Sequence, residues 1–285
     1  MRAPTRTVWP KDLTIWQSGR TGYLSVPFTW LLPKAREYVL QGDLFAKRWI
    51  VGGPAVRLMP WFFDGVPNVK IGDYAKGVLQ RVNPMATRTT VGCPRRCKFC
   101  GIGRRKIEGE FRELDDWPNL PVICDNNLLA ANVAHFKIVI DRLVHWQWCD
   151  FNQGLDARLL TPWHAEQIAR ITVPMVRLSL DSDADREAWT TAVDRLRTAG
   201  IAKKRIRTYV LCGLSGGPEA DWARCEFVES FKLRALPQWY HPLDAMTYGA
   251  VTPEQEAMGW TKQGQRHLMR YYYQHTGRPL AQGAI

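Results

Sequence analysis

The chain has 285 residues, of which 46% are hydrophobic, and a formal net charge of +12. This length suits one large α/β domain, alone or with a small extension. No apolar run is long enough to span a membrane, and the amino-terminal residues lack the hydrophobic segment of a signal peptide. We therefore expect a cytoplasmic protein with reduced thiols and no membrane partner. The positive charge favours an acidic partner, such as a nucleic acid, a nucleotide or an acidic electron donor.

Residues 1–87 predict a small α/β extension. Residues 30–40 have the composition of a helix, with Gly42 just past its end. Residues 47–51 predict a short buried strand, which ends at a turn formed by Gly52, Gly53 and Pro54.

A cysteine-rich loop follows this extension. Cys93, Cys97 and Cys100 have the spacing C-x3-C-x2-C, with Phe99 before the last cysteine and Gly101 after it. A structural zinc site takes four ligands, whereas three thiolates suit a [4Fe–4S] cluster that keeps one iron open for a small molecule.

Other uses of three cysteines remain open. They include a disulfide knot, an electron-transfer cluster, and a zinc site completed by His135 or Cys124. The absence of a signal peptide argues against disulfides. A zinc site would need further ligands, and the sequence has no second C-x-x-C pair to supply them.

The loop resembles the signature loop of the radical S-adenosylmethionine (SAM) enzymes. The resemblance implies that Cys93, Cys97 and Cys100 hold a [4Fe–4S] cluster whose open iron binds the amino and carboxylate groups of SAM. It also implies that Phe99 and Gly101 contact SAM, with the aromatic ring against the adenine. One electron, supplied by a flavodoxin or ferredoxin, then cleaves SAM to methionine and a 5′-deoxyadenosyl radical.

The extension resembles part of the Rossmann-like domain that precedes the core of cobalamin-dependent members of the family. The Asp-x-His-x-x-Gly motif that binds cobalt in those members is missing, and no histidine occurs before His135. We therefore expect a shortened remnant of this domain that uses no cobalamin.

Strands and helices alternate from Arg88 onwards. Six strands are expected, at residues 88–91, 121–125, 148–153, 176–180, 206–211 and 236–240. The helix after the fourth strand is expected to be capped by Asp183 and to bury Trp189, Val193 and Leu196. The six repeats, in residues 88–243, resemble the partial (βα)6 TIM-like barrel of the family, and residues 244–285 are expected to form a helical tail. Ligand sites in such barrels lie at the carboxyl ends of the strands.

Polar residues follow the second strand. Asp125, Asn126 and Asn127 offer carboxylate and amide oxygens at the point where the family binds the SAM ammonium group. The same residue types also form ordinary Asx turns at the end of a strand.

The third strand ends in a run that resembles uncharacterised bacterial and phage radical SAM proteins. Gln153 and Asp156 are candidates for binding ribose hydroxyls or substrate, and Arg158 for a two-pronged contact with a carboxylate. The alternative is an Asp156–Arg158 ion pair that only braces the loop.

The fourth strand places Arg177, Ser179 and Asp181 on one face, because they alternate with apolar residues. The family has a basic or hydroxyl residue here that meets the SAM carboxylate, which makes Arg177 and Ser179 candidates. A purely structural salt bridge of Arg177 is the alternative.

Four further cysteines give no second cluster motif, and most are expected to be small core residues. Among them, Cys212 at the end of the fifth strand is the best candidate for a thiol that faces the pocket, and it is a weak candidate for a catalytic role.

Two groups of basic residues border the predicted core. The first lies beside the cluster loop and is suited either to docking an acidic electron donor or to contacting phosphates; it consists of Arg95, Arg96, Lys98, Arg104, Arg105 and Lys106. The second mixes cations with aromatic residues in the tail, between Lys262 and Arg278. It suits nucleic-acid binding, or alternatively an amphipathic helix that closes the barrel.

The sequence therefore predicts an enzyme that abstracts hydrogen from a substrate by radical SAM chemistry. The charge favours a nucleic-acid base or a nucleotide as the substrate. A peptide or an amino-acid-derived substrate is the alternative. A non-catalytic iron–sulfur or zinc protein that binds nucleic acid is a third reading.

Overall fold

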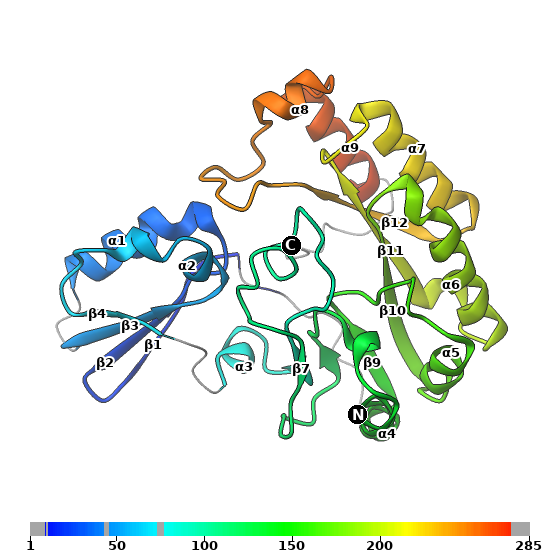
Figure 1. Ribbon diagram of the computed structural model, residues 1–285, viewed down its shortest axis with the longest axis horizontal. Coiled ribbons are helices and arrows are strands. Elements are labelled where there is room, and N and C mark those ends of the chain that lie inside the picture. The colour runs from blue at the N-terminus through cyan, green and yellow to red at the C-terminus, as the bar shows by residue number, and fades with distance from the viewer. Residues whose placement is uncertain (1–8, 10, 43–45, 73–76, 275–285) are drawn as a thin grey trace.

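The computed structural model describes residues 9, 11–42, 46–72 and 77–274, and it is a mixed α/β protein with two main sheets (Figure 1). The smaller, amino-terminal sheet has the strand order β1-β2-β3-β4. β1 and β2 are antiparallel, whereas β2, β3 and β4 are parallel. The strands are β1 Thr14–Ser18, β2 Thr21–Ser25, β3 Arg48–Gly52 and β4 Val69–Ile71, and the helices of this part are α1 Leu32–Gln41, α2 Pro54–Leu58 and α3 Val78–Val82.

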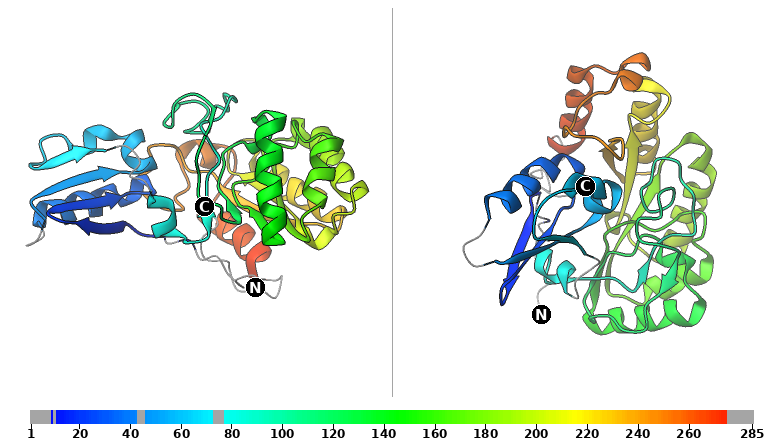
Figure 2. Two further views of the ribbon diagram at one scale, coloured as in Figure 1. Left: turned by 90° about the horizontal axis from the view of Figure 1, so that it is seen from below. Right: turned by 60° about the vertical axis from the view of Figure 1, so that its left-hand side comes forward.

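The amino-terminal sheet has its own hydrophobic core. Leu24 of β2, Leu32 of α1 and Val51 of β3 are almost completely buried in it. The helix and the strand expected at residues 30–40 and 47–51 are confirmed as α1 and β3. Figure 2 shows this unit beside the larger sheet.

The larger sheet has six strands, all parallel, in the order β12-β11-β10-β9-β8-β5. β5 and β12 are its two edge strands, so the described strands form an open sheet. α4, α5, α6 and α7 connect its strands and lie along one side of it (Figure 1). The strands are β5 Ala86–Thr87, β8 Val122–Ile123, β9 Trp148–Phe151, β10 Val173–Leu180, β11 Ile206–Cys212 and β12 Arg234–Trp239, and the helices are α4 Val133–Trp146, α5 Pro162–Ala169, α6 Arg186–Thr198 and α7 Gly217–Ser230.

Two predicted details differ from the structure. The strand expected at residues 88–91 is divided: β5 joins the main sheet, while β6 (Thr90–Val91) pairs with β7 (Arg112–Glu113) in a separate hairpin. The physical reason is that the backbone N–H groups of Thr89 and Thr90 donate to a side-chain carboxylate instead of a neighbouring strand. The helix expected to be capped by Asp183 begins at Arg186, because Asp183 starts a short 3-10 turn.

The tail contains α8 (Pro253–Ala257) and α9 (Lys262–Gln274). α9 packs against β12, and Leu268, Tyr272 and Tyr273 are buried in this contact. Two of the tail's aromatic residues thus belong to the core, which agrees with the alternative of a helix that closes the larger unit. His275 and Arg278 lie outside the described residues. In the described part of the chain, no helix is both long and apolar enough to cross a membrane.

The segment between β12 and α8 joins the two units. Thr29 Oγ1 donates to the carbonyl of Ala245 at 2.5 Å, and the ring of Trp30 lies 5.1 Å from that of His241. In Figure 1 this orange segment reaches from the larger sheet toward α1 and α2. The loop that carries the three cysteines lies between the same two units.

The core of the larger unit depends on Trp189 of α6, which is fully buried against Phe227 and Phe231. We predict that Trp189→Ala lowers the free energy of unfolding by about 3–5 kcal/mol, because it leaves a large cavity. Urea denaturation measures this. Trp61→Ala is the matched control, since the side chain of Trp61 is 56% exposed, and an equal loss in both variants would contradict the assignment.

Candidate functional site

A cavity of ≈ 270 Å³ lies at the carboxyl ends of the strands. Because the strands of the larger sheet are parallel, the segments that follow β5, β8, β9 and β10 meet at this one edge. The walls combine thiols, amides and both signs of charge. They comprise Cys93, Arg95, Cys97, Phe99, Cys100, Ile102, Asn126, Asn127, Gln153, Gly154, Leu155, Asp156, Ala157, Arg158, Ser179, Asp181 and Asp185.

The cysteine loop is a tight structure that depends on glycine. Gly92 has φ of +73°, and a β-carbon there would lie 2.7 Å from the carbonyl oxygen of Glu110. A β-carbon on Gly103 would lie 2.8 Å from the carbonyl oxygen of Arg95. Only glycine allows these close approaches of backbone to backbone. They bring three half-buried, free cysteines to the wall of one cavity.

The thiols of the loop influence each other electrostatically. Burial raises the pKa of Cys97, and the neighbouring Cys100, Asp181 and Cys93 raise it further. Burial likewise raises the pKa of Cys100, although the backbone N–H groups of Gly103 and Ile102 act in the opposite direction. The thiolate forms therefore need a positive counter-charge, which is what a metal centre supplies.

The three thiols of the loop do not form a site for a single ion. Among the described residues, no group of three or more His, Cys, Asp or Glu side chains is arranged to hold one metal ion. A mononuclear site needs its ligands to converge on one point, whereas a cubane cluster takes each thiolate on a different iron. The three cysteines share the wall of one cavity, and three is the number of thiolates that a cluster with one open iron takes.

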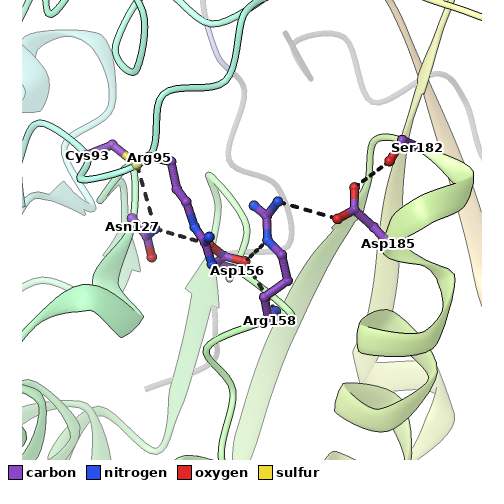
Figure 3. A network of polar contacts seen from close by, with 7 residues as sticks. All are labelled: Cys93, Arg95, Asn127, Asp156, Arg158, Ser182 and Asp185. Carbon is purple, nitrogen blue, oxygen red and sulfur yellow. Dashed lines mark hydrogen bonds and ion pairs between the residues drawn. The ribbon is translucent and has the colours of Figure 1, made fainter.

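Asn127 connects the cysteine loop with the third strand end. Its Nδ2 donates to Cys93 Sγ at 3.6 Å and to Asp156 Oδ2 at 3.3 Å (Figure 3). Its Oδ1 is buried and accepts no hydrogen bond from the described residues. A buried acceptor without a donor is costly, so this oxygen is suited to a ligand that carries an N–H or O–H group.

A chain of charges crosses the cavity. Asp156 accepts from Arg95 Nε at 2.9 Å and from Arg158 Nε at 2.7 Å, and Arg158 Nη1 reaches Asp185 Oδ1 at 3.4 Å (Figure 3). Burial raises the pKa of Asp156, but the two guanidinium groups outweigh it and hold the pKa below its usual value. The bracing Asp156–Arg158 ion pair is therefore present, and both partners also line the cavity.

Asp125 lies behind the cavity rather than on its wall. Its carboxylate is buried and accepts from Thr89 N at 2.6 Å, Thr90 N at 2.9 Å and Thr89 Oγ1 at 2.5 Å. Burial raises the pKa of Asp125, and these hydrogen bonds oppose that rise. The side chain that we expected to meet SAM instead fixes the start of the cysteine loop.

Glu108 performs a similar task from the other end of the loop. Its carboxylate, with a side chain 2% exposed, accepts from Arg88 Nη1 and Asn126 Nδ2, both at 2.6 Å, and from Gly92 N at 3.3 Å. This single side chain ties the end of the loop to its beginning and orients Asn126 on the cavity wall. No pattern in the sequence marks Glu108.

Arg177 belongs to a buried network on the inner face of the sheet. It forms a two-pronged ion pair with Asp150, with distances of 2.7 and 2.5 Å, and donates to Tyr209 Oη at 2.7 Å. It does not line the cavity. The structure therefore gives Arg177 the structural salt bridge that we had kept as the alternative.

Two residues that follow Arg177 do line the cavity. They are Ser179, on β10, and Asp181, just past its end, and the exposed Gln153 lines the wall as well. Burial raises the pKa of Asp181 to about 6, and the charge of Asp185 adds to this effect. In the described part of the chain no donor is bonded to Asp181, so it is a free acceptor near the thiols. Its spacing from Arg177 and Ser179 was the sequence signal for it.

The remaining candidates divide between the cavity and the core. Phe99 lines the cavity, whereas a β-carbon on Gly101 would face Ile107, Leu58 and Leu243 away from it. Cys212 is fully buried, does not line the cavity, and donates to the carbonyl of Val210 at 3.4 Å. The structure thus brings together most of the predicted residues and leaves Gly101, Asp125, Arg177 and Cys212 outside the wall.

No protein-family model matches the chain, and no curated protein matches it significantly. The functional argument therefore depends on the chemistry of the site itself.

We predict that Asp125→Ala loosens the cysteine loop. Two buried N–H groups lose their acceptor, so the free energy of unfolding should fall by about 3 kcal/mol, and the amides of Thr89 and Thr90 should exchange with solvent much faster. Hydrogen exchange with mass spectrometry measures this. Asp64→Ala, at an exposed position, should change neither quantity. Unchanged exchange at Thr89 and Thr90 in the Asp125 variant would refute the role of Asp125.

Proposed function

We propose that this protein is a radical SAM enzyme, in which the six-stranded sheet and its helices form a partial (βα)6 barrel. The observation that carries the proposal is the composition of one cavity. Three cysteines with C-x3-C-x2-C spacing share it with the unpartnered, buried Oδ1 of Asn127. The thiols supply ligands for three irons of a cluster, and the amide oxygen is placed to accept from the ammonium group of SAM.

The other cavity residues then have defined tasks. The ring of Phe99 packs against the adenine, and Asn126, held by Glu108, offers a further polar contact. Arg95 and Arg158 are suited to the SAM carboxylate, because each keeps guanidinium N–H groups that form no bond to Asp156 or Asp185. Ser179 and Gln153 are suited to the ribose hydroxyls.

Cys93, Cys97 and Cys100 would hold a [4Fe–4S] cluster, which would supply the one-electron reduction that cleaves bound SAM and starts hydrogen abstraction from the substrate. The chain contributes orientation and the exclusion of water. A flavodoxin or ferredoxin is the expected source of the electron. The protein has the composition of a cytoplasmic one, where thiols stay reduced.

We predict that anaerobic reconstitution with iron and sulfide gives a brown protein with close to four irons, and that this protein forms 5′-deoxyadenosine from SAM and dithionite. Cys93→Ala, Cys97→Ala and Cys100→Ala should each abolish this product, because each removes a thiolate ligand. Iron analysis, absorption spectra and chromatography of the products measure these effects.

Cys149→Ala is the matched control for these variants. Cys149 is fully buried on β9 and lies outside the loop, so the control should keep both the cluster and the reaction. A colourless protein that holds one zinc ion at full occupancy would refute the proposal and favour a non-catalytic zinc protein.

We also predict that Asn127→Ala weakens SAM binding by about tenfold or more while the iron content stays unchanged. The variant loses one hydrogen bond to a charged group, and such bonds contribute about 1.5–3 kcal/mol. Equilibrium dialysis with labelled SAM measures the affinity without any turnover. Unchanged affinity would exclude Asn127 from the SAM site.

A further inference from the structure

Four aromatic rings form a platform beside the cysteine loop, in which Tyr248 is exposed and Phe28, Trp30 and His241 are half-buried. Phe28 and Trp30 are stacked with centroids 4.6 Å apart, and His241 and Tyr248 are stacked at 5.4 Å. Trp30 contacts the second pair, with its centroid 5.3 Å from that of Tyr248. His241 is fixed by the backbone N–H of Gly249, and Tyr248 is 54% exposed. The Tyr248 ring is therefore held by its neighbours while much of it stays open to solvent.

Four cations form an exposed rim on the same loop as the cysteines: Arg96, Lys98, Arg104 and Arg105. Two other basic residues of the loop are neutralised, because Arg95 pairs with Asp156 and Lys106 with Glu110. The rim residues form no ion pair with any described residue. Exposed positive charge that is not held in ion pairs attracts a polyanion.

The rim and the platform are parts of one continuous surface. A β-carbon on Gly101, between Lys98 and Arg104, would lie 3.5 Å from Leu58 and 3.6 Å from Leu243. The loop is also bound to α2, since Arg57 Nη1 donates to the carbonyl of Ile107 at 2.6 Å. Leu243 precedes Tyr248 by five residues on the segment that reaches the amino-terminal unit (Figure 1). The segment of the platform and the loop of the rim are therefore neighbours, and the cysteines of that loop line the cavity.

We propose that this surface binds single-stranded nucleic acid, with phosphates on the rim and an unpaired base on the Tyr248 ring. Aromatic rings stack on bases only where the base faces are free, which favours a single strand over a duplex. An acidic electron-transfer protein would need the charges but not the rings. The inference that this nucleic acid is the substrate of the reaction rests on the proposed function. The inference that the surface binds nucleic acid does not.

The test is fluorescence anisotropy of the full chain with a labelled, mixed-sequence 12-nucleotide DNA or RNA, without SAM or reductant. The double variant R104A/R105A should bind more weakly and should flatten the plot of log K against log salt concentration by about 1.4, because two phosphate contacts are lost. K203A/K204A is the matched control. It removes two exposed charges at the amino-terminal end of β11, the opposite edge of the sheet, and should keep the original slope.

The aromatic part is tested separately with Tyr248→Ala, which should weaken binding of the single strand by about 5- to 150-fold, the range for loss of one stacked base. Tyr271→Ala is its control, since Tyr271 is an exposed tyrosine on α9 in the tail. The proposal is overturned by equal or tighter binding of the matching duplex, by an equal loss in the Lys203/Lys204 variant, or by a loss with Tyr271 and none with Tyr248.

One further outcome would assign the surface to a protein. If R104A/R105A slows reduction by flavodoxin but leaves nucleic-acid binding unchanged, the rim docks the electron donor and the proposal fails. Because anisotropy needs no cluster chemistry, failure of nucleic-acid binding and failure of SAM cleavage are observed independently. A protein that cleaves SAM but binds no nucleic acid would make a peptide the favoured substrate class.

Discussion

The buried carboxylate of Asp125 is the interaction on which the site depends. It accepts the N–H groups of Thr89 and Thr90, and these amides are thereby withdrawn from the main sheet. The chain consequently leaves the sheet after β5 and turns into the cysteine loop at the edge where the other strands end. Glu108 closes the same loop from its far end. Two buried carboxylates, neither of which touches the cavity, thus decide where the thiols lie.

The walls of the cavity carry side chains of both charges, and one of the carboxylates has no bonded donor among the described residues. Asp156 lies between two guanidinium groups, while Asp181 has no bonded donor and a pKa raised by burial to about 6. One part of the wall therefore carries guanidinium groups, and another part offers a free carboxylate. This asymmetry is suited to an amphoteric ligand with both a carboxylate and an ammonium group.

The alternation of strands and helices was predictable, because buried parallel strands and amphipathic helices have strong periodic patterns. Trp189, Val193 and Leu196 are buried as their spacing predicted. The cysteines were found from their spacing, and Asn127 and Asp156 from their places at strand ends. The partners of polar side chains were not predictable: Arg177 and Ser179 share a face, yet Arg177 pairs with Asp150 from another strand. Glu108 lies in an irregular loop, so no helical or strand periodicity predicts the direction of its side chain.

The link from Arg95 to Asp156 ties the middle of the cysteine loop to the segment after β9 by protein contacts alone. Small zinc modules behave differently, because their chains collapse only when the ion arrives. In the proposed enzyme, a cluster held by Cys93, Cys97 and Cys100 would bind to a loop whose position is already fixed by the ion pair of Arg95 and Asp156.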